Sequence, residues 1–262
     1  MSRSLRLRPI IRRRDDPLDR LSAELVKIDD CWVRIHRKAY DDGTLGDRFP
    51  GLPLQAEHGE SSEPGAPTSS VPTFVLIHGI GVSSRYFVNL AEDLCRLGDV
   101  FLLDLPGFAN LPHPHRPLSI ASFAALVHKV LVSHGVRNPV MLGHSMGAQV
   151  VTELLAQCPG YASRAILIGP PVNACERTFT RQLIRFTQSS IHENRRLRLI
   201  AIRAYLQCGF SWFFDILPHM MRYPIEERIQ EVTEPVLLVR GEHDYVCPTP
   251  WLGRLGAENP HI

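Results

Sequence analysis

Short apolar runs alternate with segments of helical spacing along most of this chain. Runs of about four to eight apolar residues are typical of buried strands, and apolar positions three and four residues apart are typical of helices. Strands are predicted at Thr73–Ile77, Val100–Leu103, Val140–Leu142, Ala165–Ile168 and Pro235–Val239, and helices at Tyr86–Leu97, Ile120–Ser133 and Met146–Gln157. This alternation predicts an α/β fold with a doubly wound, mostly parallel sheet.

Three segments precede this alternation. Residues 1–24 are rich in arginine, with seven arginines and three aspartates in the first twenty, which favours a basic disordered arm over an anionic-surface contact. Leu25–Ile28 and Trp32–Ala39 predict two strands of a hairpin that turns at Asp29-Asp30. Residues 41–71 are rich in Gly, Pro and Ser, so they predict a long loop.

The alternation stops between residues 171 and 231. Phe179, Leu183 and Phe186 keep helical spacing, as do Leu197, Ile200 and Ala204. We therefore predict a helical cap at residues 171–231, inserted into a core domain formed by residues 25–170 and 232–262. Parallel sheets bind ligands beyond the carboxyl ends of their strands, where this cap would lie.

The most informative motif is Gly143-His144-Ser145-Met146-Gly147, which lies between a predicted strand and a predicted helix. This context favours a nucleophile elbow, a sharp turn that exposes one serine hydroxyl at the end of a parallel sheet. The alternative is a purely structural turn. The elbow interpretation makes Ser145 the candidate nucleophile.

Two further motifs also follow predicted strands. His78-Gly79-Ile80-Gly81 is placed to supply a backbone donor for an oxyanion, so we nominate the amides of Ile80 and Met146, with Gly81 as a substitute. Gly241-Glu242-His243-Asp244 offers a carboxylate that could orient a catalytic imidazole. We favour Asp244 over Glu242, because alternate side chains of a short turn point to opposite sides.

Together with Asp104-Leu105-Pro106-Gly107-Phe108, these motifs resemble the α/β-hydrolase superfamily, in its capped serine hydrolase branch. The resemblance covers the chain from about Leu25 onward and implies a serine hydrolase that cleaves an ester or a related acyl or carbon–carbon bond. It implies no cofactor, and a structural role for Asp104. An apolar, ester-like small molecule would then contact Trp212, Phe213 and His219, unless these aromatic residues form the cap's own core.

The catalytic histidine is not at its expected place. The resemblance puts it after one more strand, whereas only 18 residues follow Asp244. His261 would lie at the wrong end of an incomplete strand. We therefore expect a truncated chain that lacks the last strand and helix and has impaired activity. The alternative function is a non-catalytic ligand-binding or regulatory protein on the same scaffold.

Composition and charge bear on the partners and the location of the protein. A net charge of +2 gives no reason to expect a nucleic-acid partner, and no apolar run approaches the length of about 18 residues needed to span a membrane. The six cysteines are scattered without metal-type spacing, which predicts reduced thiols in a cytoplasmic protein and no metal site. The sequence leaves the oligomeric state open.

Overall fold

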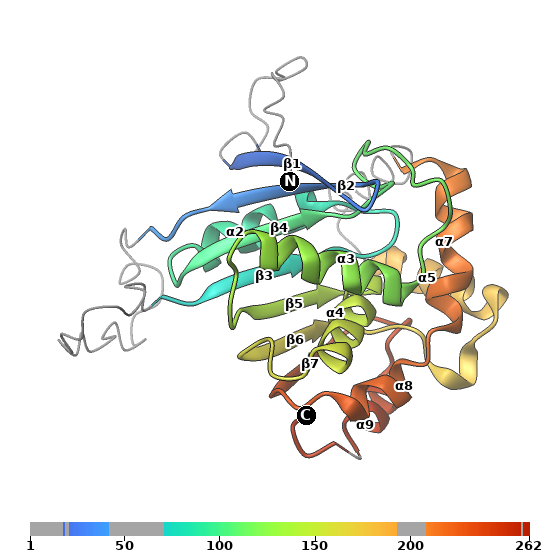
Figure 1. The fold of residues 1–262 in the computed structure, drawn as a ribbon. Helices are drawn as coiled ribbons and strands as arrows, with labels where there is room; N and C mark the ends of the chain where they lie inside the picture. Colours follow the sequence, from blue (N-terminus) through green and yellow to red (C-terminus); the bar gives the residue numbers. More distant parts are fainter. Residues whose placement is uncertain (1–17, 19–20, 42–70, 193–207, 258) are drawn as a thin grey trace, which may run out of the picture.

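A seven-stranded sheet forms the centre of the molecule (Figure 1). The computed structural model describes residue 18 and residues 21–41, 71–192, 208–257 and 259–262. The strand order is β1-β2-β4-β3-β5-β6-β7. The strands are β1 Ser22–Ile28, β2 Cys31–Lys38, β3 Thr73–Ile77, β4 Asp99–Asp104, β5 Val140–His144, β6 Arg164–Ile168 and β7 Val236–Val239.

The sheet is parallel except at one side. Strands β3 to β7 run parallel to their neighbours, whereas β1 is antiparallel to β2 and β2 is antiparallel to β4. Asp29 and Asp30 both have positive φ, at 49° and 63°, as a tight two-residue hairpin turn requires. The predicted mostly parallel α/β sheet is therefore confirmed.

Helices cover both faces of the sheet. The helical segments are η2 Ser84–Phe87, α2 Val88–Leu94, α3 Ile120–Ser133, α4 Met146–Gln157, η3 Ala174–Glu176, α5 Phe179–His192, α7 Phe210–Arg222, α8 Ile225–Arg228, η4 Ile229–Glu231 and α9 Thr249–Gly256. Buried side chains of α3, α4 and α8 pack on one face, whereas those of η2 and α2 pack on the other. Removing these apolar side chains from water is the main contribution to the stability of the two layers.

Two predicted boundaries were wrong. The helix expected at residues 86–97 is a 3-10 turn, η2, followed by α2, which ends at Leu94; the backbone N–H of Ser84, at the start of η2, donates to Asp104 Oδ1 at 2.8 Å. Strand β1 begins at Ser22, inside the predicted arm, because Ser22 pairs with Arg37 in the hairpin register. The rest of that arm, the loop of residues 42–70, and the positions Leu197, Ile200 and Ala204 lie outside the described residues.

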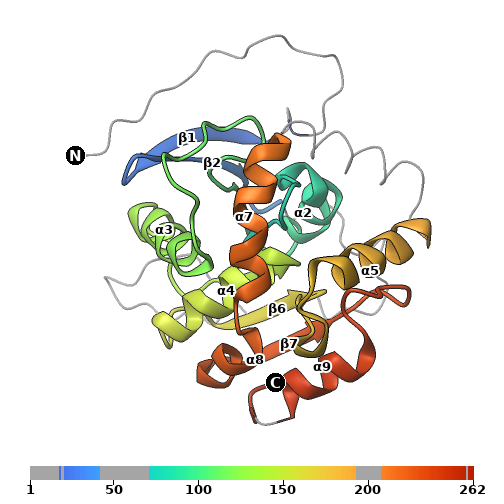
Figure 2. The same ribbon diagram turned by 90° about the vertical axis from the view of Figure 1, so that its right-hand side faces the viewer.

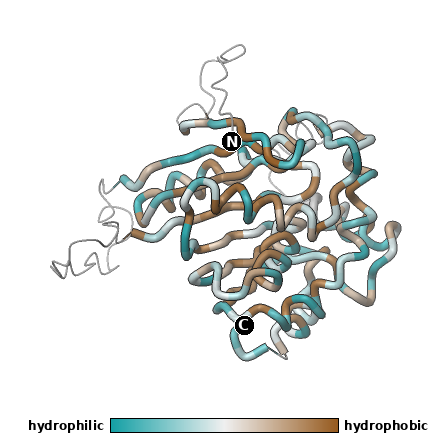
Figure 3. The backbone as a smooth tube through the Cα atoms, viewed as in Figure 1, coloured by the Kyte–Doolittle hydropathy of each residue, from teal (hydrophilic) through white to brown (hydrophobic). Residues whose placement is uncertain are grey.

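Residues 169–235, here called the insertion, separate β6 from β7. Its helices α5 and α7 lie across the edge of the sheet toward which the parallel strands point (Figure 2). Hydropathy along the backbone shows that the most apolar segments are the central strands and the helices against them (Figure 3). Within the described part of the chain, no helix combines the length and the hydropathy that crossing a bilayer would demand.

Candidate functional site

Ser145 lies in a strained turn between β5 and α4. Its backbone angles, φ 53° and ψ −123°, belong to neither element, and α4 begins at the next residue. The N–H of Ser145 donates to the carbonyl oxygen of Ile168 at 2.9 Å, and its own carbonyl accepts from Ala148 at 2.8 Å. A non-glycine residue at positive φ requires such support, and strain of this kind is concentrated at functional sites. The geometry is that of the predicted elbow.

Three glycines permit this turn through the close approach of other backbone segments. A β-carbon on Gly143 would clash with the Gly147 carbonyl, and one on Gly147 would clash with the Ile77 carbonyl. A β-carbon on Gly79 would lie 3.0 Å from the β-carbon of Ser145. The glycine spacing of the motif therefore follows from steric contact and not from chain flexibility.

The loop after β3 is braced by a buried histidine. His78 Nδ1 lies 2.8 Å from the Gly79 carbonyl oxygen, and His78 Nε2 accepts the N–H of Leu105 at 3.0 Å. Burial lowers the pKa of His78, although Asp104 and the bond to Gly79 oppose that shift. A neutral ring with its proton on Nδ1 satisfies both contacts. His78 therefore holds the loop in place.

The two nominated oxyanion donors remain available for a ligand. Among the described residues, neither the Ile80 amide nor the Met146 amide donates a hydrogen bond to another protein group. Met146 is the first residue of α4, so its N–H is one of the amides that a helix leaves unpaired at its start. Gly81, the nominated substitute, has φ 74°.

Asp244 is held in a defined orientation after β7. Its Oδ1 accepts the backbone N–H groups of Val246 and Cys247, each at 3.0 Å. A β-carbon on Gly169 would lie 2.9 Å from Oδ2. Gly169 follows Ile168, which accepts the Ser145 amide. The candidate nucleophile is therefore hydrogen-bonded to Ile168, and the candidate acid lies against the next residue, Gly169.

The ring of His144 packs beside the elbow. It stacks on Tyr86 with centroids 5.1 Å apart and meets Phe87 edge-on at 6.3 Å. Its Nδ1 is buried without a hydrogen-bond partner among the described residues. Burial, and then the charge of His78, lowers the pKa of His144 to about 4. The ring is therefore neutral near pH 7 and acts as packing.

Asp104 lies in a buried ionic cluster. Its Oδ2 is 3.2 Å from both Arg34 Nη1 and His36 Nε2, and its Oδ1 accepts the Ser84 amide. Burial by itself would raise the pKa of Asp104, but the bond to His36 and the charges of His36, His78 and Arg34 hold it well below its usual range. The cluster joins β2 to the end of β4, which agrees with the structural role that the resemblance implied.

No histidine of the described chain is bonded to Asp244. The carbonyl of His261 accepts from Val236, the first residue of β7, whereas Asp244 follows the other end of that strand. His113 stacks on Trp212 at 5.0 Å. A base for Ser145 is therefore not assigned among the described residues.

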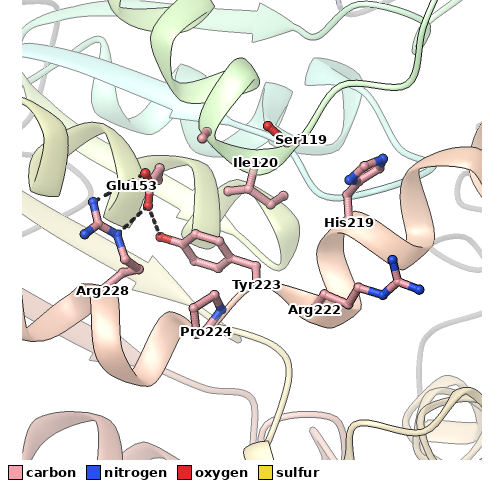
Figure 4. Close-up of a pocket in the computed structure, with 9 residues that line it drawn as sticks. Ser119, Ile120, Glu153, His219, Arg222, Tyr223, Pro224 and Arg228 are labelled. Atoms are coloured by element: carbon pink, nitrogen blue, oxygen red, sulfur yellow. Dashed lines mark hydrogen bonds and ion pairs between the residues drawn. The ribbon is translucent and has the colours of Figure 1, made fainter.

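His219 lines a separate pocket of about 300 Å³ (Figure 4). Its floor is Glu153, which accepts hydrogen bonds from Arg228 Nε at 2.8 Å and from the Tyr223 hydroxyl at 2.9 Å. Burial alone would raise the pKa of Glu153, but the bonds from Arg228, Gln157 and Tyr223 lower it. Neither Ser145 nor Asp244 lines this pocket.

The aromatic residues Trp212 and Phe213 do not line either of the pockets found among the described residues. Trp212 is only 2% exposed, and its indole lies where a side chain on Gly107 would be. Phe213 is partly buried against the same core. This packing favours the alternative interpretation, in which the aromatic run belongs to the core of the insertion.

Sequence reasoning missed Gln149, which is fully buried four residues after Ser145. Its Nε2 donates to the carbonyls of Pro171 and Met220, each at 3.0 Å, and so joins α4 to the start of the insertion and to the last turn of α7. Trp251 Nε1 holds the neighbouring Pro170 carbonyl at 2.9 Å. A glutamine within the apolar run of α4 was the available signal, because buried amides require partners.

The described residues hold no cluster of three or more side chains suited to a metal ion. All six cysteines are free thiols in the structure.

Comparisons with known proteins agree with this architecture. Residues 72–190 match the family described as alpha/beta hydrolase fold. A protein of Escherichia coli O150:H5 (strain SE15) named "Putative carbamate hydrolase RutD" is 32% identical over 129 residues, which is 48% of this chain and 47% of that protein. The chain thus matches about half the length of such curated relatives.

Solved structures resemble nearly the whole chain. A bacterial membrane phospholipase A gives a TM-score of 0.68 with 19% identity, covering 93% of this chain and 77% of the other. Carboxylesterase CesB from Bacillus subtilis gives 0.65 with 17% identity, covering 94% of this chain and 86% of the other. At this identity the similarity shows a shared fold.

Proposed function

Because the chain belongs to the α/β-hydrolase superfamily, we propose that it is a serine hydrolase acting on an ester or a related acyl bond. The observation that supports this most directly is that Ser145 is hydrogen-bonded to Ile168 while Asp244 lies against the next residue, Gly169. A nucleophile and a carboxylate at the same edge of a parallel sheet are the two fixed ends of a catalytic triad. The relatives that are named as hydrolases act on bonds of this class.

In this mechanism the Ser145 oxygen attacks the substrate carbonyl and loses its proton to a base. The carbonyl oxygen becomes negative and accepts hydrogen bonds from the amides of Ile80 and Met146, both of which are free for that role. The leaving group takes the proton, and water then hydrolyses the acyl-enzyme. Asp244 would orient the base, which we do not assign to a residue.

The insertion would act as a cap over this site. Its helices α5 and α7 lie at the edge of the sheet toward which the parallel strands point (Figure 2), and Ser145 follows one of these strands, β5. Such a cap excludes water and contacts the substrate. The apolar character of α5 and α7 agrees with an apolar acyl or alkyl group as the substrate.

A fluorophosphonate probe tests the role of Ser145. We expect the probe to label the native chain on Ser145 and to leave the Ser145→Ala variant unlabelled. The exposed Ser122→Ala variant is the matched control and should be labelled like the native chain. Equal labelling of Ser145→Ala, or labelling only after denaturation, would refute the proposed nucleophile.

The second candidate is a non-catalytic binding protein on this scaffold. The observation that favours it is that no histidine contacts Asp244 within the described residues. Hydrolysis of a p-nitrophenyl ester that disappears in Ser145→Ala would exclude this candidate. Saturable ligand binding without labelling or turnover would replace the hydrolase proposal with it.

A further inference from the structure

A second pocket of about 490 Å³ lies between α5 and α7 in the insertion. Arg177 and Phe179 line it at the start of α5, and Leu217, Pro218, Met221 and Arg222 line it on α7. Its volume is within the range of about 300–1,000 Å³ that is common for small-molecule sites. Ser145 and Asp244 do not line it, so an inference about its ligand does not rest on the proposed hydrolase activity.

The walls of this pocket are apolar and accessible. Phe179 is 49% exposed, and its ring lies 6.4 Å from that of Phe214, which is 53% exposed. Other large apolar side chains of α5 and α7 are also exposed, namely Leu183, Ile184, Phe186 and Phe210. Exposed apolar residues that cluster on two adjacent helices mark a binding surface more often than scattered ones do.

The pocket also contains positive charge that nothing in the described chain neutralises. Arg222 forms no ion pair with any described residue. Arg177 contacts Glu226 and the Tyr223 carbonyl through Nη2, but its Nε is buried without an acceptor. A neutral apolar ligand would remove water from Arg222 without replacing its hydrogen bonds, which is unfavourable. An anionic group would supply the missing acceptors.

The neighbouring pocket around His219 differs in this respect. The negative charge of Glu153 is matched there by Arg228 and by the Tyr223 hydroxyl. Figure 4 shows the Arg222 guanidinium turned away from that group, on the side of α7 that carries His219. Arg222 lines both pockets, but among the described lining residues only those of the pocket between α5 and α7 include no carboxylate.

We propose that the pocket between α5 and α7 binds a single-chain amphiphile with a carboxylate head group. The chain would lie against Phe179, Leu217 and Met221. The carboxylate would accept hydrogen bonds from the guanidinium of Arg222. The structure thus assigns to the insertion a ligand site that is separate from Ser145.

Isothermal titration with three ligands of equal chain length, each below its micelle concentration, tests this proposal. Decanoate should bind saturably with one site per chain, whereas decanol and decyltrimethylammonium should bind at least about tenfold more weakly, since hydrogen bonds to a charged group contribute about 1.5–3 kcal/mol. The Ser145→Ala variant should bind decanoate like the native chain. That result would show that decanoate binding at this site does not require the Ser145 hydroxyl, whether or not the chain is a hydrolase.

Variants then locate the site. Arg222→Gln should weaken decanoate binding about tenfold or more without changing decanol binding, and Arg222→Lys should restore part of the loss. Leu217→Asn should weaken both ligands. The Arg164→Gln variant is the control for the loss of one positive charge, because Arg164 is the exposed first residue of β6.

Three results would overturn the proposal. These are the absence of saturable decanoate binding, an unchanged affinity in Arg222→Gln, and binding only to phosphatidylglycerol vesicles, which would indicate a membrane-facing surface. Circular dichroism melting of each variant shows whether it is folded, and the exposed position of Arg222 makes Arg222→Gln the safest substitution.

Discussion

The backbone N–H of Ser145 donates a hydrogen bond to the carbonyl oxygen of Ile168 at 2.9 Å. The next residue, Gly169, donates its own N–H to the Val239 carbonyl at 2.8 Å and lies against Asp244. The ends of β5, β6 and β7 are therefore joined by backbone contacts of two consecutive residues. Movement at this point would displace the nucleophile and the carboxylate together.

Substitution of Gly169 tests that junction. Gly169→Ala should lower the free energy of unfolding for two reasons, a φ of 56° and a β-carbon 2.9 Å from Asp244 Oδ2. Gly135→Ala is the matched control, because Gly135 has φ 69° but no neighbour within 4 Å. We expect a loss of about 1 kcal/mol for Gly135→Ala and a clearly larger loss for Gly169→Ala. Equal losses in urea denaturation would show that Asp244 does not press on Gly169.

Loss of the Gln149 amide should loosen the insertion. Gln149→Met keeps the size of the side chain but removes both hydrogen bonds and leaves the Pro171 and Met220 carbonyls unpaired, so we expect a loss of about 2 kcal/mol. Gln157→Met, on an exposed turn of the same helix, removes only the single bond to Glu153 Oε1 and should cost less than about 1 kcal/mol. Hydrogen exchange should speed up in α7 for the first variant only. An unchanged exchange rate in α7 would show that the Gln149 hydrogen bonds do not hold the insertion on the core.

Stability should depend on pH through His144. The pKa of His144 is lowered by burial from 6.5 to about 4, so the unfolded chain binds the proton first as the pH falls. Its contribution is complete above pH 6.5 and is lost between pH 6.5 and 4, with a size of about 3 kcal/mol. Urea denaturation across this range should show a shallower slope for His144→Gln. The slope that remains would come in part from His78, whose pKa is also lowered by burial.

The choice between two acidic residues can be tested on the rate of fluorophosphonate labelling. Asp244→Asn keeps the shape of the side chain but removes the charge that would stabilise an imidazolium, so labelling should slow at least about tenfold. Glu242→Gln should leave the rate unchanged, since Glu242 is exposed. A slower rate in the Glu242 variant alone would reverse the assignment of the acid.

The sequence predicted the sheet and the elbow because both depend on local patterns. Apolar runs define β3 to β7, and the glycines around Ser145 are explained by contacts at fixed spacing. The roles of Gln149 and Trp251 could not be predicted, since their partners Pro170, Pro171 and Met220 are distant in sequence. Such pairings arise only when the insertion docks on the core.

The role of Trp212 could not be predicted for a related reason. An aromatic residue that lines a ligand pocket cannot be told from one in a packed interior by its residue type alone. Only the contact with Gly107 and the stack on His113 distinguish the two situations. Nor could it be predicted that Arg222 forms no ion pair with any described residue.

Gln149 holds one carbonyl at the start of the insertion and one in the last turn of α7. A segment joined to the core at one point can move as a rigid body, whereas a segment joined at two points can only bend between them. Access to Ser145 would then depend on bending of the insertion between these two hydrogen bonds, and the side-chain amide of Gln149 would limit that bending.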